Sequence, residues 1–404
     1  MTTSLLFHVY GLRDQELLRT DFKYSAVTVK VKTKEDKLQC SHCHSWQVIK
    51  SGTKERLFRG IPIGSRPVYI IIKVQRLECK QCGRIRQEKI KFARPKSHYL
   101  NSFRRYVLEL SRIGTISDIA DHLGIGWDVV KEIQKEYLLK NYGRPNLENV
   151  EYIAIDEFAI EKGHKYMTVV YDLVSGVILY AAKGKDAESL EGFWRRLKKK
   201  DVHIKAAAID MSPAYISAVS TNVPEAQIVF DRFHIKRQFN EQITKLRRDL
   251  YRQETDLGKK DLLKGTRWLL LKNKENLDSQ KNEHARLQEA LDINRPLAIA
   301  YYMKEELDLI WEQDNREEAE KVLGSWVAKA FACGVPRLKK FANSLLAHRS
   351  GIFAWYDYPI STGPLEGINN KIKTMKRQAY GFRDDEFFIL KLYSLHEKTY
   401  ALTG

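Results

Sequence analysis

The sequence predicts a multidomain α+β protein, and three observations lead to this expectation. Four of the five cysteines form two Cys-x-x-Cys pairs in a strand-like segment near the N-terminus. Apolar strands alternate with helical segments between about residues 151 and 230, and a long stretch rich in Leu, Lys and Glu with helical periodicity follows. A chain of 404 residues has room for two to four domains.

Charge is distributed unevenly along the chain. Lys and Arg outnumber Asp and Glu by 69 to 51, a net charge of +18. Residues 1–150 hold 28 Lys and Arg against 15 Asp and Glu, so +13 of this surplus lies in the first part of the chain. A basic N-terminal part is typical of proteins that dock on a polyanion such as nucleic acid, although a solvated basic surface is the alternative. No apolar segment reaches membrane-spanning length, and we expect a cytoplasmic protein.

The first predicted domain, residues 1–97, is a β-rich zinc ribbon. Cys40 and Cys43 form one pair, and Cys79 and Cys82 form the other. Thiolates two residues apart on a tight turn can share one ion, and two such turns complete a tetrahedral structural Zn²⁺ site. A disulfide framework is disfavoured in a reducing cytoplasm, and a redox pair would not need a second copy.

Basic residues accompany both cysteine pairs. The arginines between the pairs, Arg59 among them, are expected to project outward from alternating strands. Arg84 and Arg86 begin a basic connector that runs to Lys96. The connector is either a strip that contacts phosphates or an ordinary solvated linker.

The second predicted domain, residues 98–145, carries a helix-turn-helix pattern at 115–139. Gly124 permits the tight turn, and the second helix is expected to expose Trp127, Lys131 and Lys135 toward the major groove. Ordinary pairs of antiparallel helices share this pattern, but the zinc ribbon and the charge beside it favour DNA binding. The expected inward positions are Ile119, Ala120, Leu123, Val129, Val130 and Ile133.

A third domain is predicted to begin at residues 146–233 and to end in the C-terminal part of the chain. Its elements succeed one another as strand, β-hairpin, helix, strand, helix, strand, which matches an RNase H-like fold. In that fold the first and fourth strands lie side by side. The expected strands are 152–158, 165–173, 177–182, 204–210 and 226–230, and the first helix is 187–200.

Asp156 and Asp210 follow the apolar parts of the two strands that are expected to adjoin. A single Asp at a strand end often only starts a turn. Two of them on neighbouring strands would repel each other strongly unless a cation lay between them, which favours a metal site. Glu157 is expected to point to the opposite side of the strand from Asp156.

Residues 234–355 are predicted to form an all-helical insertion. Trp268, Trp311 and Trp326 are expected in its core, although exposed members could stack on bases. Asp231 and His234 come directly after a strand and either support the active site or only begin the helix. The expected helices are 237–253, 262–272, 283–293, 297–314, 317–332 and 335–347.

The C-terminal part, residues 356–404, returns to the third domain with Glu366 in the first turn of a basic helix. Helical spacing places Glu366, Asn370, Lys373 and Arg377 on one face, where a carboxylate could bind metal and the others could contact phosphate. The alternative is a capping glutamate. Three carboxylates from three segments suit two Mg²⁺ or Mn²⁺ ions in phosphodiester chemistry.

With these motifs the chain resembles the ISL3 family of bacterial insertion-sequence transposases over nearly its whole length. The resemblance rests on the cysteine pairs, the helix-turn-helix, and five short blocks. These blocks are Ala154-Ile-Asp-Glu157, Ala208-Ile-Asp-Met-Ser212, Phe230-Asp-Arg-Phe-His234, Gly363-Pro-Leu-Glu-Gly-Ile-Asn-Asn-Lys371 and Tyr380-Gly-Phe-Arg383.

The resemblance implies a DDE transposase whose acidic triad is Asp156, Asp210 and Glu366, with the basic Lys373 seven residues after the glutamate. It also implies Mg²⁺-dependent cleavage at the element's ends and joining of a 3′-hydroxyl to target DNA. The N-terminal modules would read the terminal inverted repeats, and a homodimer would hold two ends on the bacterial nucleoid. The rival functions are a non-catalytic DNA-binding regulator and a structure-selective nuclease.

Overall fold

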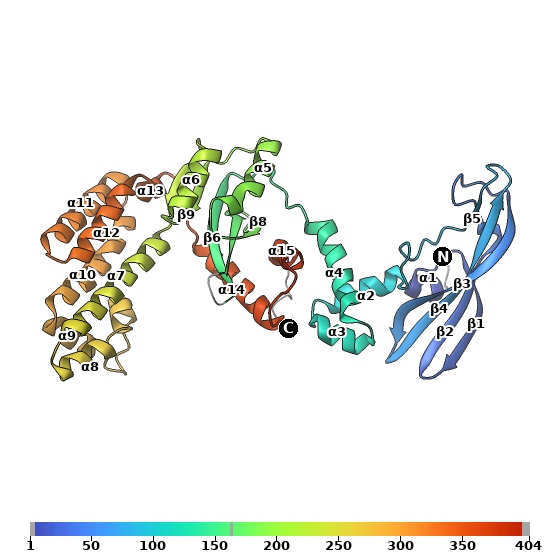
Figure 1. Cartoon of the computed structure of the whole chain (residues 1–404), viewed down its shortest axis with the longest axis horizontal. Coiled ribbons are helices and arrows are strands. Elements are labelled where there is room, and N and C mark those ends of the chain that lie inside the picture. Colours follow the sequence, from blue (N-terminus) through green and yellow to red (C-terminus); the bar gives the residue numbers. More distant parts are fainter. Residues whose placement is uncertain (1–4, 162–164, 398–404) are drawn as a thin grey trace. The chain divides into compact units, whose positions relative to one another are not determined.

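The computed structural model of the chain describes residues 5–161 and 165–397 and divides into two compact units. The first unit comprises Met1–Asn141 with Met375–Arg383, and the second comprises Tyr142–Thr374 with Asp384–Glu397 (Figure 1). Each unit has its own buried core and its own sheet.

The sheet of the first unit is built on a long hairpin. Its order is β1-β2-β4-β3, with β5 paired to β4, and β2 and β4 are its parallel pair. Side chains alternate along each strand, and the inward ones include Val31, Phe58 and Ile70, all fully buried. The strands are β1 (Gln15–Lys23), β2 (Ala26–Thr33), β3 (Val48–Ile63), β4 (Arg66–Cys79) and β5 (Ile85–Gln87).

Helices of the first unit pack on this sheet and share its core. The sequence-predicted helix-turn-helix is present: Ile119, Leu123 and Ile133 are buried, and Gly124 has the left-handed φ of 60° that ends the first helix. Thr115 and Asp118 form a capping box at its start. The helices are α1 (Leu5–Tyr10), α2 (Asn101–Leu110), α3 (Ile116–Leu123) and α4 (Trp127–Tyr142).

Arg59 is half-buried and its guanidinium packs against other residues of the first unit, so the prediction that it projects outward is wrong. Its guanidinium lies 5.0 Å from the ring centre of Tyr69 and donates a 3.0 Å hydrogen bond to the carbonyl of Leu123. Leu123 is the last residue of α3, where carbonyls have no partner within the helix. Arg59 therefore fastens the helix-turn-helix to the sheet.

The sheet of the second unit has the order β10-β9-β6-β7-β8. β9 runs parallel to both β6 and β10, whereas β7 is antiparallel to β6 and to β8. This is the strand order expected of an RNase H-like fold, and the predicted pairing of the first and fourth strands is confirmed. The strands are β6 (Tyr152–Glu161), β7 (Lys165–Asp172), β8 (Ile178–Lys183), β9 (Ala206–Ile209) and β10 (Gln227–Phe230).

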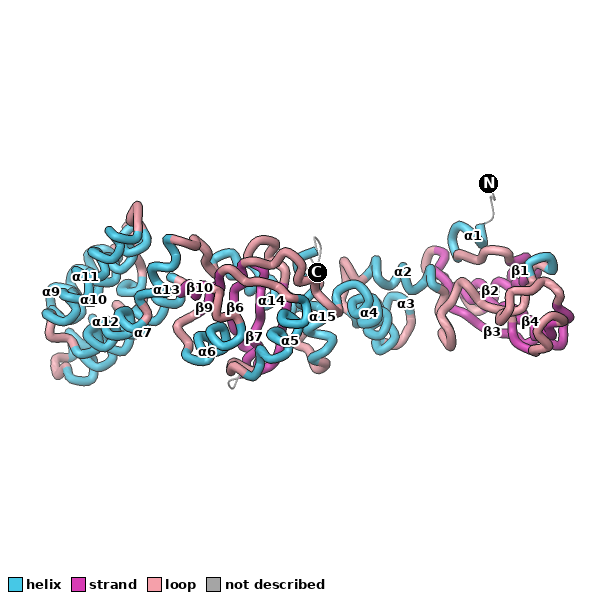
Figure 2. The backbone as a smooth tube through the Cα atoms, turned by 90° about the horizontal axis from the view of Figure 1, so that it is seen from above, coloured by secondary structure: helices cyan, strands magenta, loops and turns pink. Residues whose placement is uncertain are grey.

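Helices cover both faces of this sheet (Figure 2). On one face, Ile155 and Val170 share a core with Phe193 of α5 (Glu191–Lys200) and Tyr215 of α6 (Pro213–Asn222). On the other face, Phe158 packs edge-on against Phe388 of α15 (Asp385–Tyr393). The helix α14 (Gly363–Gln378), which carries Glu366, contacts this second face through Asn369.

A helical insertion separates β10 from α14, as predicted. It begins with α7 (Arg232–Gln253), whose Phe239 packs against Trp326 and Phe341. The other helices are α8 (Leu257–Gly265), α9 (Glu283–Ile293), α10 (Arg295–Asp308), α11 (Arg316–Ala332), α12 (Pro336–Ala347) and α13 (Arg349–Phe353).

Two predictions for the insertion are wrong, and they have one cause. The expected helix 262–272 instead ends at Gly265, a poor helix former, and the Thr266 hydroxyl bonds back to the Leu262 carbonyl at 3.1 Å. The chain then turns, so Trp268 is 64% exposed rather than buried in the core. Trp311 and Trp326 are buried as predicted.

None of the helices within residues 5–161 and 165–397 is both long enough and apolar enough to cross a membrane.

Candidate active site

The candidate active site lies where β6 and β9 separate. The two strands pair from Tyr152 with Ala206 to Ala154 with Ala208. β9 ends at Ile209, directly before Asp210, while β6 continues past Asp156 and stays paired with β7. The parallel register therefore delivers the two carboxylates to the same end of the sheet.

Both oxygens of Asp156 accept hydrogen bonds. The backbone amide of Glu157 donates to Oδ1 at 2.8 Å, and the side-chain amide of Asn369 donates to Oδ2 at 2.9 Å. The Asn369 carbonyl oxygen in turn accepts from the Tyr171 hydroxyl at 3.1 Å. Asp156 is 9% exposed, so these contacts fix its side chain within a largely buried setting.

His234 stands between two carboxylates. Its Nε2 lies 3.8 Å from Oδ1 of Asp156 and 3.6 Å from Oδ2 of Asp231. Arg237 donates a 2.8 Å hydrogen bond to Nδ1, and because guanidinium only donates, the proton of a neutral ring must sit on Nε2, facing the carboxylates. Asp231 also caps α7 and accepts from the Thr362 hydroxyl, just before α14.

Burial and the negative charge of this site raise the pKa values of two further carboxyl groups. Burial raises the pKa of Asp210, and the nearby charge of Asp156 adds to this rise, while His234 and Arg237 oppose it. Burial likewise raises the pKa of Glu157, with Asp210 and Asp156 adding to the effect. Ionising both carboxyl groups together therefore costs free energy unless a cation lies close to them.

Asp156 and Glu157 reach opposite faces of the sheet, as predicted from strand alternation. Asp156 meets α14 through Asn369, whereas Glu157 interacts with Tyr215 of α6. Burial, together with the charges of Glu157 and Asp210, raises the pKa of Tyr215. Glu157 nevertheless lies close enough to Asp210 for the charge of Asp210 to contribute to the raised pKa of Glu157.

Glu366 is exposed on the first turn of α14. Among the residues that the structure describes, the cysteine quartet is the only group of three or more His, Cys, Asp or Glu whose ligand atoms all lie within 4.8 Å of one another. The carboxylate oxygens of the three acids in the predicted triad therefore do not all lie within 4.8 Å of one another. Two of them adjoin, and the helix of the third is fastened to Asp156 by Asn369 three residues further on.

The sequence analysis did not assign a role to Asn369, although this residue lies in the block from Gly363 to Lys371 and about one helical turn after Glu366. On the same helix, Asn370, Lys373 and Arg377 are exposed, as a phosphate-contacting face requires.

The four predicted zinc ligands come together in the first unit. The Cys40 and Cys82 sulfurs are 3.8 Å apart, and those of Cys43 and Cys79 are 3.5 Å apart. Four Zn–S bonds of about 2.3 Å in a tetrahedron place sulfurs about 3.8 Å apart, so the quartet fits Zn²⁺. Backbone amides of Cys43 and His42 lower the pKa of Cys40, which favours the thiolate.

The predicted DNA-contact residues of the first unit differ in exposure. Trp127 is 62% exposed at the start of α4, and Arg84 and Arg86 are also exposed. Lys131 and Lys135, which the sequence predicts to be exposed, are half-buried. Half-burial of a lysine stem still leaves its charged end able to reach outward.

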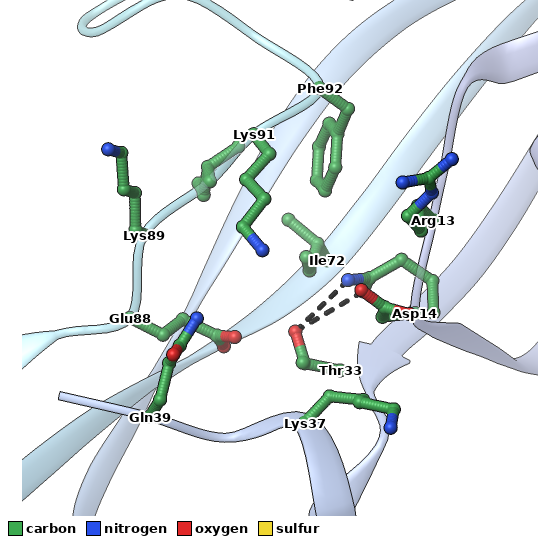
Figure 3. Close-up of a pocket in the computed structure, with 12 residues that line it drawn as sticks. Arg13, Asp14, Thr33, Lys37, Gln39, Ile72, Glu88, Lys89, Lys91 and Phe92 are labelled. Carbon is green, nitrogen blue, oxygen red and sulfur yellow. Dashed lines mark hydrogen bonds between the residues drawn. The ribbon is translucent and has the colours of Figure 1, made fainter. Parts of the chain in front are cut away.

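The basic connector also borders a small hollow in the first unit. Lys89 and Lys91 line it together with Arg13 from the other side (Figure 3). Asp14 and Glu88 line the same hollow and offset part of the positive charge.

Three family patterns match the chain. Residues 153–392 match a family described as transposase, of the DDE type in ISL3 elements. Residues 36–82 match the zinc-finger of transposase IS204/IS1001/IS1096/IS1165, and residues 88–138 match the helix-turn-helix domain of transposase family ISL3.

Similar proteins agree with these patterns. The chain is 34% identical to the transposase for insertion sequence element IS1001 of Bordetella parapertussis over 343 residues, 84% of each protein. It is 25% identical to the transposase for insertion sequence element IS1557 of Mycobacterium tuberculosis, covering 87% of this chain and 83% of the relative.

A solved Drosophila P element transposase strand transfer complex aligns with 66% of this chain and 81% of its own at 10% identity, but a TM-score of 0.34 is too weak to bear on the fold. The family patterns and the relatives, together with the cysteine quartet and the helix-turn-helix, show a DNA-binding transposase with a zinc ribbon. The chain belongs to the ISL3 family of insertion-sequence transposases.

Proposed function

We propose that Asp156, Asp210 and Glu366 hold two Mg²⁺ or Mn²⁺ ions and catalyse cleavage and strand transfer at the ends of the element. The observation that carries the proposal is the arrangement of the two parallel strands, which brings Asp156 and Asp210 to one end of the sheet, where Asn369 fastens the helix of Glu366. Both DNA reactions are in-line displacements at phosphorus, so one site can serve each of them.

The acidic residues fit a divalent cation in charge and in free lone pairs. Burial and the neighbouring carboxylates already make ionisation of Asp210 and Glu157 costly, and a cation would remove that cost. A carboxylate oxygen has two lone pairs. Each oxygen of Asp156 uses one for its hydrogen bond, which leaves one on each for metal.

Bound divalent ions would activate the attacking oxygen and stabilise the leaving one. The protein's part is to hold the ligands in place. Asn369 fixes the orientation of the Asp156 carboxylate, and Tyr171 fixes the Asn369 amide. His234 places its Nε2 proton toward the carboxylates of Asp156 and Asp231 and so limits their repulsion.

Glu366 supplies the third carboxylate from the exposed face of α14. Asn370 and Lys373 lie on that same exposed face and are suited to contact the phosphates of the strand that is cut. A carboxylate in the first turn of a helix also sits at the positive end of the helix dipole, which favours its ionised form.

The test is a nicking and joining assay on DNA that contains the element's own ends, with Mg²⁺ or Mn²⁺. Asp156→Asn, Asp210→Asn and Glu366→Gln should each abolish cleavage. Asp172→Asn is the matched control, because this buried carboxylate at the end of β7 only accepts from the turn at Val174 and Ser175. It should retain cleavage.

A second readout is metal binding itself. Mn²⁺ should raise the thermal midpoint of the wild-type protein, and Asp156→Asn and Asp210→Asn should lose most of that rise. End binding without any metal-dependent cutting would favour the regulator. Cutting that ignores the terminal repeats and never joins a 3′-hydroxyl would favour the structure-selective nuclease.

End recognition is assigned to the zinc ribbon within 1–97 and the helix-turn-helix within 98–145, and catalysis to 146–233 and 356–404. Trp127, Lys131 and Lys135 of α4 and Arg84 and Arg86 near the zinc site are the proposed DNA contacts. Footprinting on the element's ends should show protection that Arg84→Ala and Trp127→Ala weaken. Two ends require two copies, so light scattering with end DNA should report a homodimer; such an assembly would reside on the nucleoid.

A further inference from the structure

The helical insertion carries a basic hollow that the catalytic proposal leaves without a role. It lies between α7 and α8, which contact each other (Figure 1). Its volume is about 270 Å³, and its lining contains no acidic residue among those that the structure describes. The lining residues are Arg247, Arg248, Tyr251, Arg252 and Lys264.

Arg247 is the buried member of this cluster. It is 9% exposed, and its Nη1 donates a 2.8 Å hydrogen bond to the Leu263 carbonyl. Its Nε is buried and has no hydrogen-bond partner. Burial, followed by the positive charges of Arg267 and Arg248, lowers the pKa of Arg247. A buried guanidinium with an unused donor among other cations calls for an anionic acceptor.

Several other cations of the insertion have carboxylate partners. Lys236 pairs with Asp308 at 2.8 Å, and Arg337 donates to Asp249 at 2.8 Å. In the described part of the chain, neither Arg248 nor Arg252 nor Lys264 forms such a pair. The dipole of α7 favours a cation only in its last turn, which accounts for Arg252 but not for Arg247 and Arg248.

Aromatic rings accompany the charge. Trp268 is 64% exposed, and the Arg267 guanidinium lies 4.5 Å from its ring centre. Tyr251, in the lining, is 36% exposed. Cations with exposed rings beside them are the combination by which proteins hold single-stranded nucleic acid: the cations follow the phosphates, and the rings stack on bases.

We propose that this hollow binds the phosphate backbone of a single-stranded DNA segment, with Trp268 stacking on one of its bases. The proposal rests on the proposed function, because a strand that has been cut at an element end and has unpaired from its complement is such a segment. Arg247, which lines the hollow from its buried position, would add its positive charge to those of Arg248, Arg252 and Lys264, and these three would neutralise the neighbouring phosphates.

The test measures binding of the full chain to a labelled single-stranded oligonucleotide and, separately, to duplex end DNA, by fluorescence anisotropy over a range of salt. Trp268→Ala should weaken single-strand binding about tenfold or more. Arg248→Ala should weaken it and make the salt slope shallower by roughly 0.7. Lys245→Ala is the matched control, since it removes one exposed cation of α7 outside the hollow.

All three substituted side chains are exposed, so folding should be kept, and thermal midpoints check this. Single-strand affinity that falls no further in Trp268→Ala and Arg248→Ala than in Lys245→Ala would overturn the proposal. An equal loss on duplex and single strand would also overturn it and would identify a duplex-phosphate contact instead. The outcome is separate from the catalytic test, because no cleavage is needed: Asp156→Asn should bind the single strand as the wild type does.

Discussion

Replacing Asn369 by Ala tests whether the helix of Glu366 must be fastened to Asp156. The change removes the 2.9 Å hydrogen bond to Oδ2 of Asp156 and leaves the Tyr171 hydroxyl without its acceptor. A hydrogen bond to a charged group contributes about 1.5–3 kcal/mol. If that free energy serves to position the carboxylate in the transition state, cleavage should slow about 10- to 100-fold.

The assay is single-turnover cleavage of duplex end DNA at saturating enzyme, so that binding does not limit the rate. Tyr171→Phe should slow cleavage less, since it keeps the hydrogen bond from Asn369 to Asp156 and removes only the hydrogen bond that the Asn369 carbonyl oxygen accepts from Tyr171. Thr374→Ala is the control on the same helix, because that hydroxyl donates only to the Asn370 carbonyl, at 3.0 Å. If Asn369→Ala cleaves at the wild-type rate at any Mn²⁺ concentration, the reasoning is refuted.

Three further outcomes are expected. Without metal at pH 7, Asp210→Asn should unfold at or above the wild-type temperature. Burial raises the pKa of Asp210 in the folded protein above its value in the unfolded chain, so the folded protein loses stability as the pH rises from the unfolded pKa through the folded pKa, and a neutral asparagine avoids this loss. A lower midpoint would contradict this. Cys79→Ser should lose bound zinc and weaken end binding, whereas Cys333→Ser, outside the quartet, should keep both; a zinc release assay decides. Trp326→Ala should cost about 3–5 kcal/mol in urea unfolding, and the exposed Trp268→Ala far less; equal losses would argue against a packed insertion core.

Local patterns in the sequence were enough to predict the strands of the third domain and the pairing of its first and fourth strands. The alternation of apolar residues and the succession of strands placed Asp156 and Asp210 on adjoining strands, which β6 and β9 confirm. Cys-x-x-Cys spacing likewise predicted a quartet that the structure brings together. These signals depend on neighbours a few residues apart, which a sequence shows directly.

The contacts that complete the site depend on docking between distant segments, which no local pattern reveals. Asn369 and Asp156 are 213 residues apart, and Thr362 and Asp231 are 131 apart. Arg59 was expected outside for a similar reason: its partner, the Leu123 carbonyl, belongs to a helix 64 residues later. Trp268 was misplaced because one glycine ended its helix early.

The late position of α14 has a consequence for how the protein is made. Ribosomes would release the zinc ribbon, the sheet and the whole insertion before the helix that carries Glu366 and Asn369 emerges. Because these two residues follow the zinc ribbon, the helix-turn-helix and the insertion along the chain, a nascent chain would be able to bind DNA before it could cut it. Stalled chains ending near residue 355 should therefore bind element ends yet leave them intact, and nicking by such chains would contradict this order.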